Sequence, residues 1–181
     1  MKFIEKFISF LESKKNKSYD KGCAMLYFDF PDFEKLTDQI EEIDIYTKDG
    51  FGIETEPHVT LLYGLDPKVT LDQVEEVIGE LEFSPVKIGG ASLFENEEYD
   101  VLKFTATSSN LQVANRKLKE LPYQNDYPDY KPHLTIAYLK SGRGKKYVEK
   151  FSGMNWELDP KYVVFSPPTG EKSQIEISKK S

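Results

Sequence analysis

One short segment occurs twice in this chain, and it constrains the fold and the chemistry more than any other feature. Residues 57–63 read Pro-His-Val-Thr-Leu-Leu-Tyr, and residues 132–138 read Pro-His-Leu-Thr-Ile-Ala-Tyr. Pro, His, Thr and Tyr stand at the same offsets in both copies. The chain has two histidines in 181 residues, and both lie in this repeat. The repeat therefore indicates two equivalent elements that share one role.

Both copies have the composition of β-strands. Each is rich in β-branched, aliphatic and aromatic residues, and each begins at a proline, which a strand tolerates at its first position. Side chains alternate along a strand, so His58 and Thr60 share one face while Tyr63 belongs to the other, packing face. The second copy repeats this arrangement with His133, Thr135 and Tyr138. If the two strands are neighbours, the imidazoles face one another across a cleft.

Composition and charge favour a compact domain that binds a small ligand. Hydrophobic residues make up 39% of the chain and aromatic residues 13%, which is enough for one buried core. The net charge of -7 and the pI near 5.0 oppose tight binding of long nucleic acid. Cys23 is the single cysteine, so an internal disulfide is excluded, a structural zinc site is disfavoured, and a reducing cytoplasm is the expected compartment.

The N-terminal segment differs from the rest of the chain. Residues 1–22 are expected to form an amphipathic helix followed by a linker, because apolar residues recur at helical spacing with charged residues between them. Those charges distinguish the segment from a signal peptide or a membrane span, and packing on the domain surface is favoured over membrane attachment. Residues 23–181 are expected to form a single bilobal domain.

The rest of the pattern alternates between strands and helices. Besides the two repeat strands, we expect strands at 23–30, 86–94, 101–107, 156–165 and 174–177, and helices at 31–40, 71–81, 110–121 and 145–151. Strand, helix, His-strand, helix, strand occurs in each half. This order predicts an α+β fold in which helices pack on one face of antiparallel or mixed sheets and leave a central groove on the other.

Paired histidines suggest acid-base chemistry. An unperturbed imidazole pKa of about 6.5 allows one histidine to be neutral and the other protonated near neutral pH, so a facing pair supplies a general base and a general acid. Displacement at phosphorus needs both, together with donors for the non-bridging oxygens, which Thr60 and Thr135 supply. No cofactor is required. A two-histidine zinc site is the competing interpretation, but no third ligand is evident in the repeat.

These motifs resemble the 2H phosphoesterase superfamily, which is named for two His-x-Thr or His-x-Ser motifs. The resemblance implies a bilobal, pseudo-twofold α+β fold with both motifs in a central groove, and His58, Thr60, His133 and Thr135 as the catalytic residues. Residues 19–27, Tyr-Asp-Lys-Gly-Cys-Ala-Met-Leu-Tyr, and the chain length are similar to the bacteriophage anti-CBASS phosphodiesterases, which degrade cyclic oligonucleotide signals of bacterial immunity.

Candidates for substrate binding lie outside the repeat. Tyr27 and Trp156 are candidates for stacking on a base, although burial in the core is favoured for each. Glu157 adjoins Trp156, and Lys131 adds positive charge next to the second motif. Residues 141–146, Ser-Gly-Arg-Gly-Lys-Lys, have the composition of a phosphate-binding loop. An extended strand separates them from His133, so they are expected at the end of the strand away from the histidines, and a solvated turn is favoured.

We therefore expect a metal-independent phosphodiesterase that cleaves 3′-5′ bonds of a cyclic di- or oligonucleotide through a 2′,3′-cyclic phosphate. Its expected location is the cytoplasm, that of the host if the protein comes from a phage. No membrane, protein partner or long nucleic acid is expected. Two alternatives remain: a 2′,3′-cyclic phosphodiesterase of RNA ends, and a nucleotide-binding sponge without turnover. Retention of both His-x-Thr motifs argues against the sponge, because binding alone needs no acid opposite a base.

Overall fold

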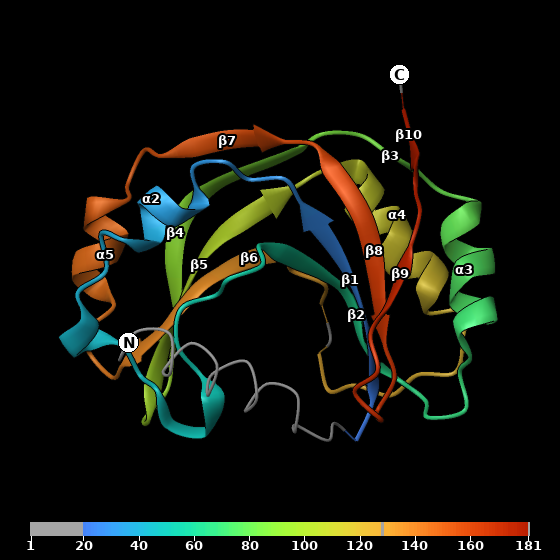
Figure 1. The fold of residues 1–181 in the computed structure, drawn as a ribbon, viewed down its shortest axis with the longest axis horizontal. Helices are drawn as coiled ribbons and strands as arrows, with labels where there is room; N and C mark the ends of the chain where they lie inside the picture. The colour runs from blue at the N-terminus through green and yellow to red at the C-terminus, as the bar shows by residue number, and fades with distance from the viewer. Residues whose placement is uncertain (1–19, 128, 181) are drawn as a thin grey trace, which may run out of the picture.

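A computed structural model describes residues 20–127 and 129–180 of the chain (Figure 1). Residues 1–19 of the expected N-terminal helix and linker lie outside the described residues. In the described part, eight strands form one sheet in the order β7-β4-β5-β6-β2-β1-β8-β9, and β3 and β10 pair separately. The strands are β1 (Gly22–Phe28), β2 (His58–Leu65), β3 (Glu82–Phe83), β4 (Val86–Glu95), β5 (Tyr99–Thr107), β6 (His133–Lys140), β7 (Asn155–Leu158), β8 (Pro160–Ser166), β9 (Ser173–Ile175) and β10 (Ser178–Lys179).

The sheet is antiparallel throughout, and the two repeat strands β2 and β6 lie side by side at its centre. Figure 1 shows it as a curved sheet, with α2 and α5 beyond one half and α3 and α4 beyond the other. The predicted α+β class is thus confirmed. The bilobal, pseudo-twofold arrangement stays a prediction.

The helices form where the periodicity of the sequence predicts them. They are α2 (Phe33–Thr37), α3 (Leu71–Gly79), α4 (Ser109–Leu118) and α5 (Lys145–Lys150), with short 3₁₀ turns η1 (Glu42–Asp44) and η2 (Lys48–Gly50). Thr70 caps α3, since its hydroxyl accepts a hydrogen bond from the Gln73 backbone N–H in a reciprocal capping box. No helix within residues 20–127 and 129–180 is long and apolar enough to span a membrane.

All four helices pack on the same face of the sheet. One continuous cluster of buried side chains joins them to the inner strands, and it includes Leu26 of β1, Leu134 of β6, Phe104 of β5 and Leu111 of α4. The opposite face carries His58, Thr60, His133 and Thr135, and we call it the histidine face. The helices therefore leave the two motifs uncovered on the side away from the core.

The expected faces of the repeated tyrosines were wrong. Both repeat strands change register two to four residues after the histidine, so two successive residues turn toward the core: Leu61 and Leu62 in β2, and Ile136 and Ala137 in β6. Such a bulge reverses the alternation beyond it. Tyr63 pairs with Cys23, and Tyr138 pairs with Val101. Both tyrosines consequently lie on the histidine face.

The closing strand expected at 156–165 is two strands. Its residues divide at Asp159, and β7 then pairs with β4 while β8 pairs with β1 on the far side of the centre. Pro160 lacks a backbone N–H and opens β8, which is where a strand accepts proline. The chain thus crosses from one half of the sheet to the other at this point.

The segment before each histidine runs beside the strand of the other motif. Residues 45–54 extend along β6, with bridges from Ile45 to Leu139 and from Ile53 to Ala137. Residues 122–124 lie along β2, where the Gln124 N–H donates to the Gly64 carbonyl at 2.8 Å. The segment that leads into each repeat strand therefore holds the other repeat strand in place.

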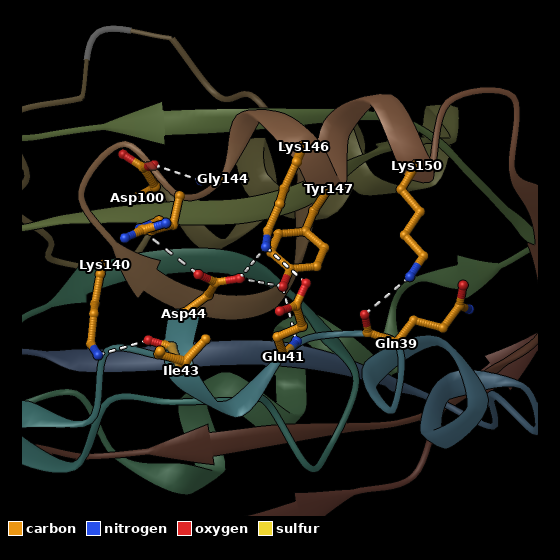
Figure 2. Close-up of polar contacts among 11 residues, drawn as sticks. Gln39, Glu41, Ile43, Asp44, Asp100, Lys140, Gly144, Lys146, Tyr147 and Lys150 are labelled. Atoms are coloured by element: carbon orange, nitrogen blue, oxygen red, sulfur yellow. Dashed lines mark hydrogen bonds and ion pairs between the residues drawn. The ribbon is translucent and has the colours of Figure 1, made fainter.

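A polar network anchors the start of the first of these segments to α5 (Figure 2). The Asp44 carboxylate is buried and lies 2.6 Å from Lys146 Nζ, and the Tyr147 hydroxyl donates to it at 2.6 Å. Tyr147 Oη also accepts the Glu41 N–H at 2.9 Å. These hydrogen bonds and the nearby cations hold the pKa of the Asp44 carboxyl below its ordinary value of 3.8.

Candidate active site

The two motifs meet at one point in the sheet. Val59 of β2 is the Cα partner of Leu134 of β6, in an antiparallel pair. Because the strands are antiparallel, the positions next to this pair place His58 opposite Thr135 and Thr60 opposite His133. The two histidines are then diagonal neighbours on one face, a relation that separates Cα atoms by about 7–8 Å in a regular sheet. A phosphate group between the imidazoles would meet a nitrogen on each side.

Both imidazoles are held by the same hydrogen bond. His58 Nδ1 lies 2.9 Å from the Glu56 carbonyl oxygen, and His133 Nδ1 lies 2.9 Å from the Lys131 carbonyl oxygen. A carbonyl oxygen only accepts, so Nδ1 carries the hydrogen in both rings. The neutral form of either histidine therefore has its lone pair on Nε2, which is the nitrogen available for proton transfer.

His58 belongs to a row of aromatic rings across three strands. Its ring stacks on that of Tyr27 in β1 at a centroid distance of 5.2 Å, and Tyr27 stacks on Tyr162 in β8 at 5.6 Å. The Tyr27 side chain is only 6% exposed. The structure therefore places Tyr27 on the histidine face, where its ring lies between two neighbours and orients His58.

His133 lies in a different environment, next to a phenylalanine ring and a lysine ammonium. The edge of the Phe94 ring meets its imidazole at a centroid distance of 5.1 Å, and Lys103 Nζ lies 4.1 Å from the centre of the Phe94 ring. Burial lowers the pKa of His133, the hydrogen bond to Lys131 opposes this, and the charges of Lys103 and His58 lower it further. These effects favour the neutral form of His133.

The two threonines have different neighbours. Thr60 is the Cα partner of Met25 and lies near the Cys23 thiol, whose pKa burial raises to about 12. Thr135 is the Cα partner of Lys103. Both threonines lie on the histidine face, next to the histidine of the other motif. Each is in position to donate to an oxygen held between the imidazoles.

A cavity of about 540 Å³ adjoins the site. It is lined by residues of β4, β5 and β7, among them Thr105, Asn155, Trp156 and Glu157. Thr105 is also the Cα partner of His133, so the cavity begins one strand away from that histidine. Trp156 contributes to the wall, but its ring packs edge-on against Phe104 in the core at 5.2 Å.

Lys131 and the 141–146 segment are the remaining predicted residues. Lys131 is exposed and approaches the site through its carbonyl oxygen. In the 141–146 segment, the Gly144 N–H donates to the Asp100 carboxylate at 2.9 Å, and Lys146 is paired with Asp44 (Figure 2). This segment therefore binds carboxylates of the same chain, in agreement with its interpretation as a turn.

Three residues of the site were missed from the sequence. Lys103 had a signal, because its charge stands between the apolar residues Leu102 and Phe104. Phe94 and Tyr162 had none, since their places beside the motifs depend on strand pairing across the sheet. In residues 20–127 and 129–180, no three His, Cys, Asp or Glu side chains come close enough together to hold a metal ion.

Comparisons with known proteins agree with this geometry. A family model described as anti-CBASS protein Acb1 matches residues 54–164, which is more than half of the chain and contains both motifs. The structure of Kluyveromyces marxianus Usb1 superposes with a TM-score of 0.56 at 10% sequence identity, covering 88% of this chain and 99% of that one. A structure of the same Usb1 with uridine monophosphate gives the same values. At this identity the likeness concerns the fold alone. The comparison with curated protein sequences gives no match.

Proposed function

The chain belongs to the Acb1 family of anti-CBASS proteins and is a phosphodiesterase, and from this premise we propose that it cleaves 3′-5′ phosphodiester bonds of small cyclic oligonucleotides. Two histidines on neighbouring strands carry this proposal. Both keep Nδ1 on a carbonyl oxygen and present Nε2, as a base and an acid acting on one phosphate require. In this proposal the histidines supply the proton transfers, and no metal or cofactor takes part.

We assign the base to His133 and the acid to His58. Neutral His133 Nε2 removes the proton of the ribose 2′-hydroxyl, whose oxygen then bonds to the adjacent phosphorus. The bond from phosphorus to the leaving 5′-oxygen breaks, and protonated His58 Nε2 gives its proton to that oxygen. A 2′,3′-cyclic phosphate results, and water opens it with the two roles exchanged. The lowered pKa of His133 supports this assignment, because a base must be neutral before reaction.

An intramolecular nucleophile fits a site of this kind. Holding the 2′-hydroxyl next to phosphorus replaces a bimolecular encounter, which is worth up to ~7–11 kcal/mol in well-oriented reactions. Thr60 and Thr135 donate to the non-bridging oxygens on which negative charge accumulates. We expect the nucleoside beyond His133 to enter the cavity with Glu157 and Trp156 in its wall, and Lys131 to face the substrate at the site's edge.

We also propose that the two halves of the sheet are related by a pseudo-twofold axis between β2 and β6. The strand order supports this, since β5 and β1 flank the pair and β4 and β8 follow them on either side. The matched Nδ1 hydrogen bonds and the matched bulges support it as well. Such symmetry would place the two imidazoles in equivalent positions on opposite sides of the phosphate.

A substrate panel tests the proposed function. The wild type is incubated with cyclic dinucleotides, cyclic trinucleotides and 2′,3′-cyclic mononucleotides, and the products are separated by chromatography. We expect a cyclic di- or trinucleotide to be cut, and His58→Ala or His133→Ala to slow cleavage by at least ~10²-fold while the circular dichroism spectrum is retained.

Other outcomes of the panel contradict the proposal in distinct ways. Turnover of the 2′,3′-cyclic mononucleotides alone would assign the protein to RNA ends. Tight binding of a cyclic dinucleotide without any turnover would assign it as a sponge. Full activity of either histidine variant would remove that residue from the mechanism.

A further inference from the structure

The strand next to β6 carries a buried lysine on the histidine face. Lys103 of β5 is flanked by its Cα partners, Ser92 of β4 and Thr135 of β6, and it is 9% exposed. A lysine in the middle of a sheet usually extends its ammonium to water. Lys103 instead stays beside the second His-x-Thr motif, which is an unusual place for a charge.

The contacts of the ammonium make it part of the His133 environment. Lys103 Nζ donates a hydrogen bond to Ser92 Oγ at 2.8 Å and lies 4.1 Å from the centre of the Phe94 ring. The same Phe94 ring meets the His133 imidazole. Lys103, Phe94, His133 and Thr135 therefore form one cluster around the point where the two motifs meet.

No carboxylate within residues 20–127 and 129–180 balances the charge of this ammonium. Among the described residues, Lys103 forms no ion pair with a carboxylate, whereas Lys145 and Lys146 do. Burial lowers the pKa of Lys103, and the nearby charge of Lys131 lowers it further. A buried cation with one neutral hydrogen-bond acceptor and a ring is under-stabilised, and an anion at this place would complete its coordination.

We propose that the Lys103 ammonium binds a non-bridging oxygen of the scissile phosphate, next to the Thr135 hydroxyl. This inference rests on the proposed function, because the phosphate must lie between the two histidines. An ammonium is a point-charge donor suited to phosphate, and in a partly dry site it stabilises the charge that develops during displacement. Its position also gives it a second effect, which is to disfavour protonation of His133 and so keep the base neutral.

Lys103→Met tests the contact, since methionine keeps the length of the side chain and removes the charge. The probe is cyclic di-AMP with 2′-deoxy sugars, which lacks the attacking hydroxyl, and its Kd is measured by calorimetry. We expect about 10- to 100-fold weaker binding, the range for one hydrogen bond between charged groups. Lys103→Arg keeps the cation and should restore part of the affinity.

Two control variants separate this role from a structural one. Lys68→Met removes an exposed charge in the connection between β2 and α3, and Ser92→Ala removes the hydrogen-bond acceptor of Lys103 without removing its charge. Both should bind the probe within about threefold of the wild type. If Ser92→Ala weakens binding as much as Lys103→Met does, the lysine acts by holding the sheet and the proposal is wrong.

The pKa of His133, measured by NMR in the free protein, gives a readout that does not depend on turnover. The groups that face His133 are Lys103, His58 and the Lys131 carbonyl. Removing Lys103 should raise the pKa of His133, whereas Lys68→Met should leave it unchanged. An unchanged pKa in Lys103→Met together with unchanged binding would overturn the inference.

The two proposals fail in different ways. Probe binding that depends on Lys103, with no cleavage of the ribose form of cyclic di-AMP or of any other panel substrate, would contradict the proposed function and support the phosphate contact. Cleavage that proceeds equally well in Lys103→Met and the wild type would support the proposed function and contradict the contact.

Discussion

Replacing Asp44 by alanine should destabilise the fold by about 1–3 kcal/mol. The buried Tyr147 hydroxyl would lose the acceptor of its hydrogen, and leaving such a donor unpaired costs about 1–3 kcal/mol. The ion pair with Lys146 adds little, because the lysine side chain is 46% exposed and water screens it. The sum is a large part of the ~5–15 kcal/mol by which domains are stable.

Urea unfolding at neutral pH measures this effect. With a slope of about 2 kcal/mol per molar urea, the midpoint of Asp44→Ala should fall by about 0.5–1.5 M. Glu41→Gln is the matched control, since Glu41 pairs with the same Lys146 but is 64% exposed, and its midpoint should change little. Equal midpoints for the two variants would refute this account of the network.

The pH dependence of Asp44→Ala has a defined sign. The pKa of Asp44 is lowered in the folded state, so the stability contributed by its carboxylate is present above the ordinary value of 3.8 and is lost as the pH falls through the lowered folded value. The difference in unfolding free energy between the wild type and Asp44→Ala should therefore shrink in acid. A difference that grows in acid would contradict the assigned cause.

Three further predictions concern the site and its support. Thr60→Val and Thr135→Val should each reduce kcat less than the histidine variants do, because each removes one donor from a shared environment; loss equal to that of a histidine would contradict this role. Activity should survive excess chelator and show a bell-shaped pH profile whose acid limb lies below 6.5, since the pKa of the neutral base is lowered. Loss on chelation with rescue by zinc would favour a metal site. Gly64→Ala should lower the unfolding free energy by more than about 2 kcal/mol, because the φ of Gly64 is +107° and a Cβ there would stand 2.3 Å from the Gln124 carbonyl oxygen. Gly142→Ala is the control: Gly142 has a φ of +79° but open space around it, so this variant should lower the unfolding free energy by about 1 kcal/mol.

Much of this fold follows from local patterns. The repeat strands, α3 with its Thr70 cap and the β4–β5 hairpin form where composition and periodicity predict them, because each of these signals lies within one element. The predicted family resemblance is confirmed by the family match, which contains both motifs. Two histidines in equivalent contexts were sufficient for that inference.

Other features depend on pairing between distant strands. The bulges that turn Tyr63 and Tyr138 to the histidine face arise from the register with β1 and β5, which no single segment specifies. The ring of Tyr162 reaches Tyr27 for the same reason. The division of residues 156–165 did have a local signal, since Pro160 marks the start of a new strand. The predicted single strand combines two strands that lie in different halves of the sheet.

Cleavage of a ribose substrate compared with its 2′-deoxy analogue tests the central claim most directly. In single-turnover quench experiments, cyclic di-AMP or the substrate found in the panel should give a transient 2′,3′-cyclic phosphate, and the 2′-deoxy analogue should bind without being cut. This is the result expected if paired histidines activate the 2′-hydroxyl. Cleavage of the deoxy analogue at a comparable rate would show that water attacks directly, and it would contradict the mechanism.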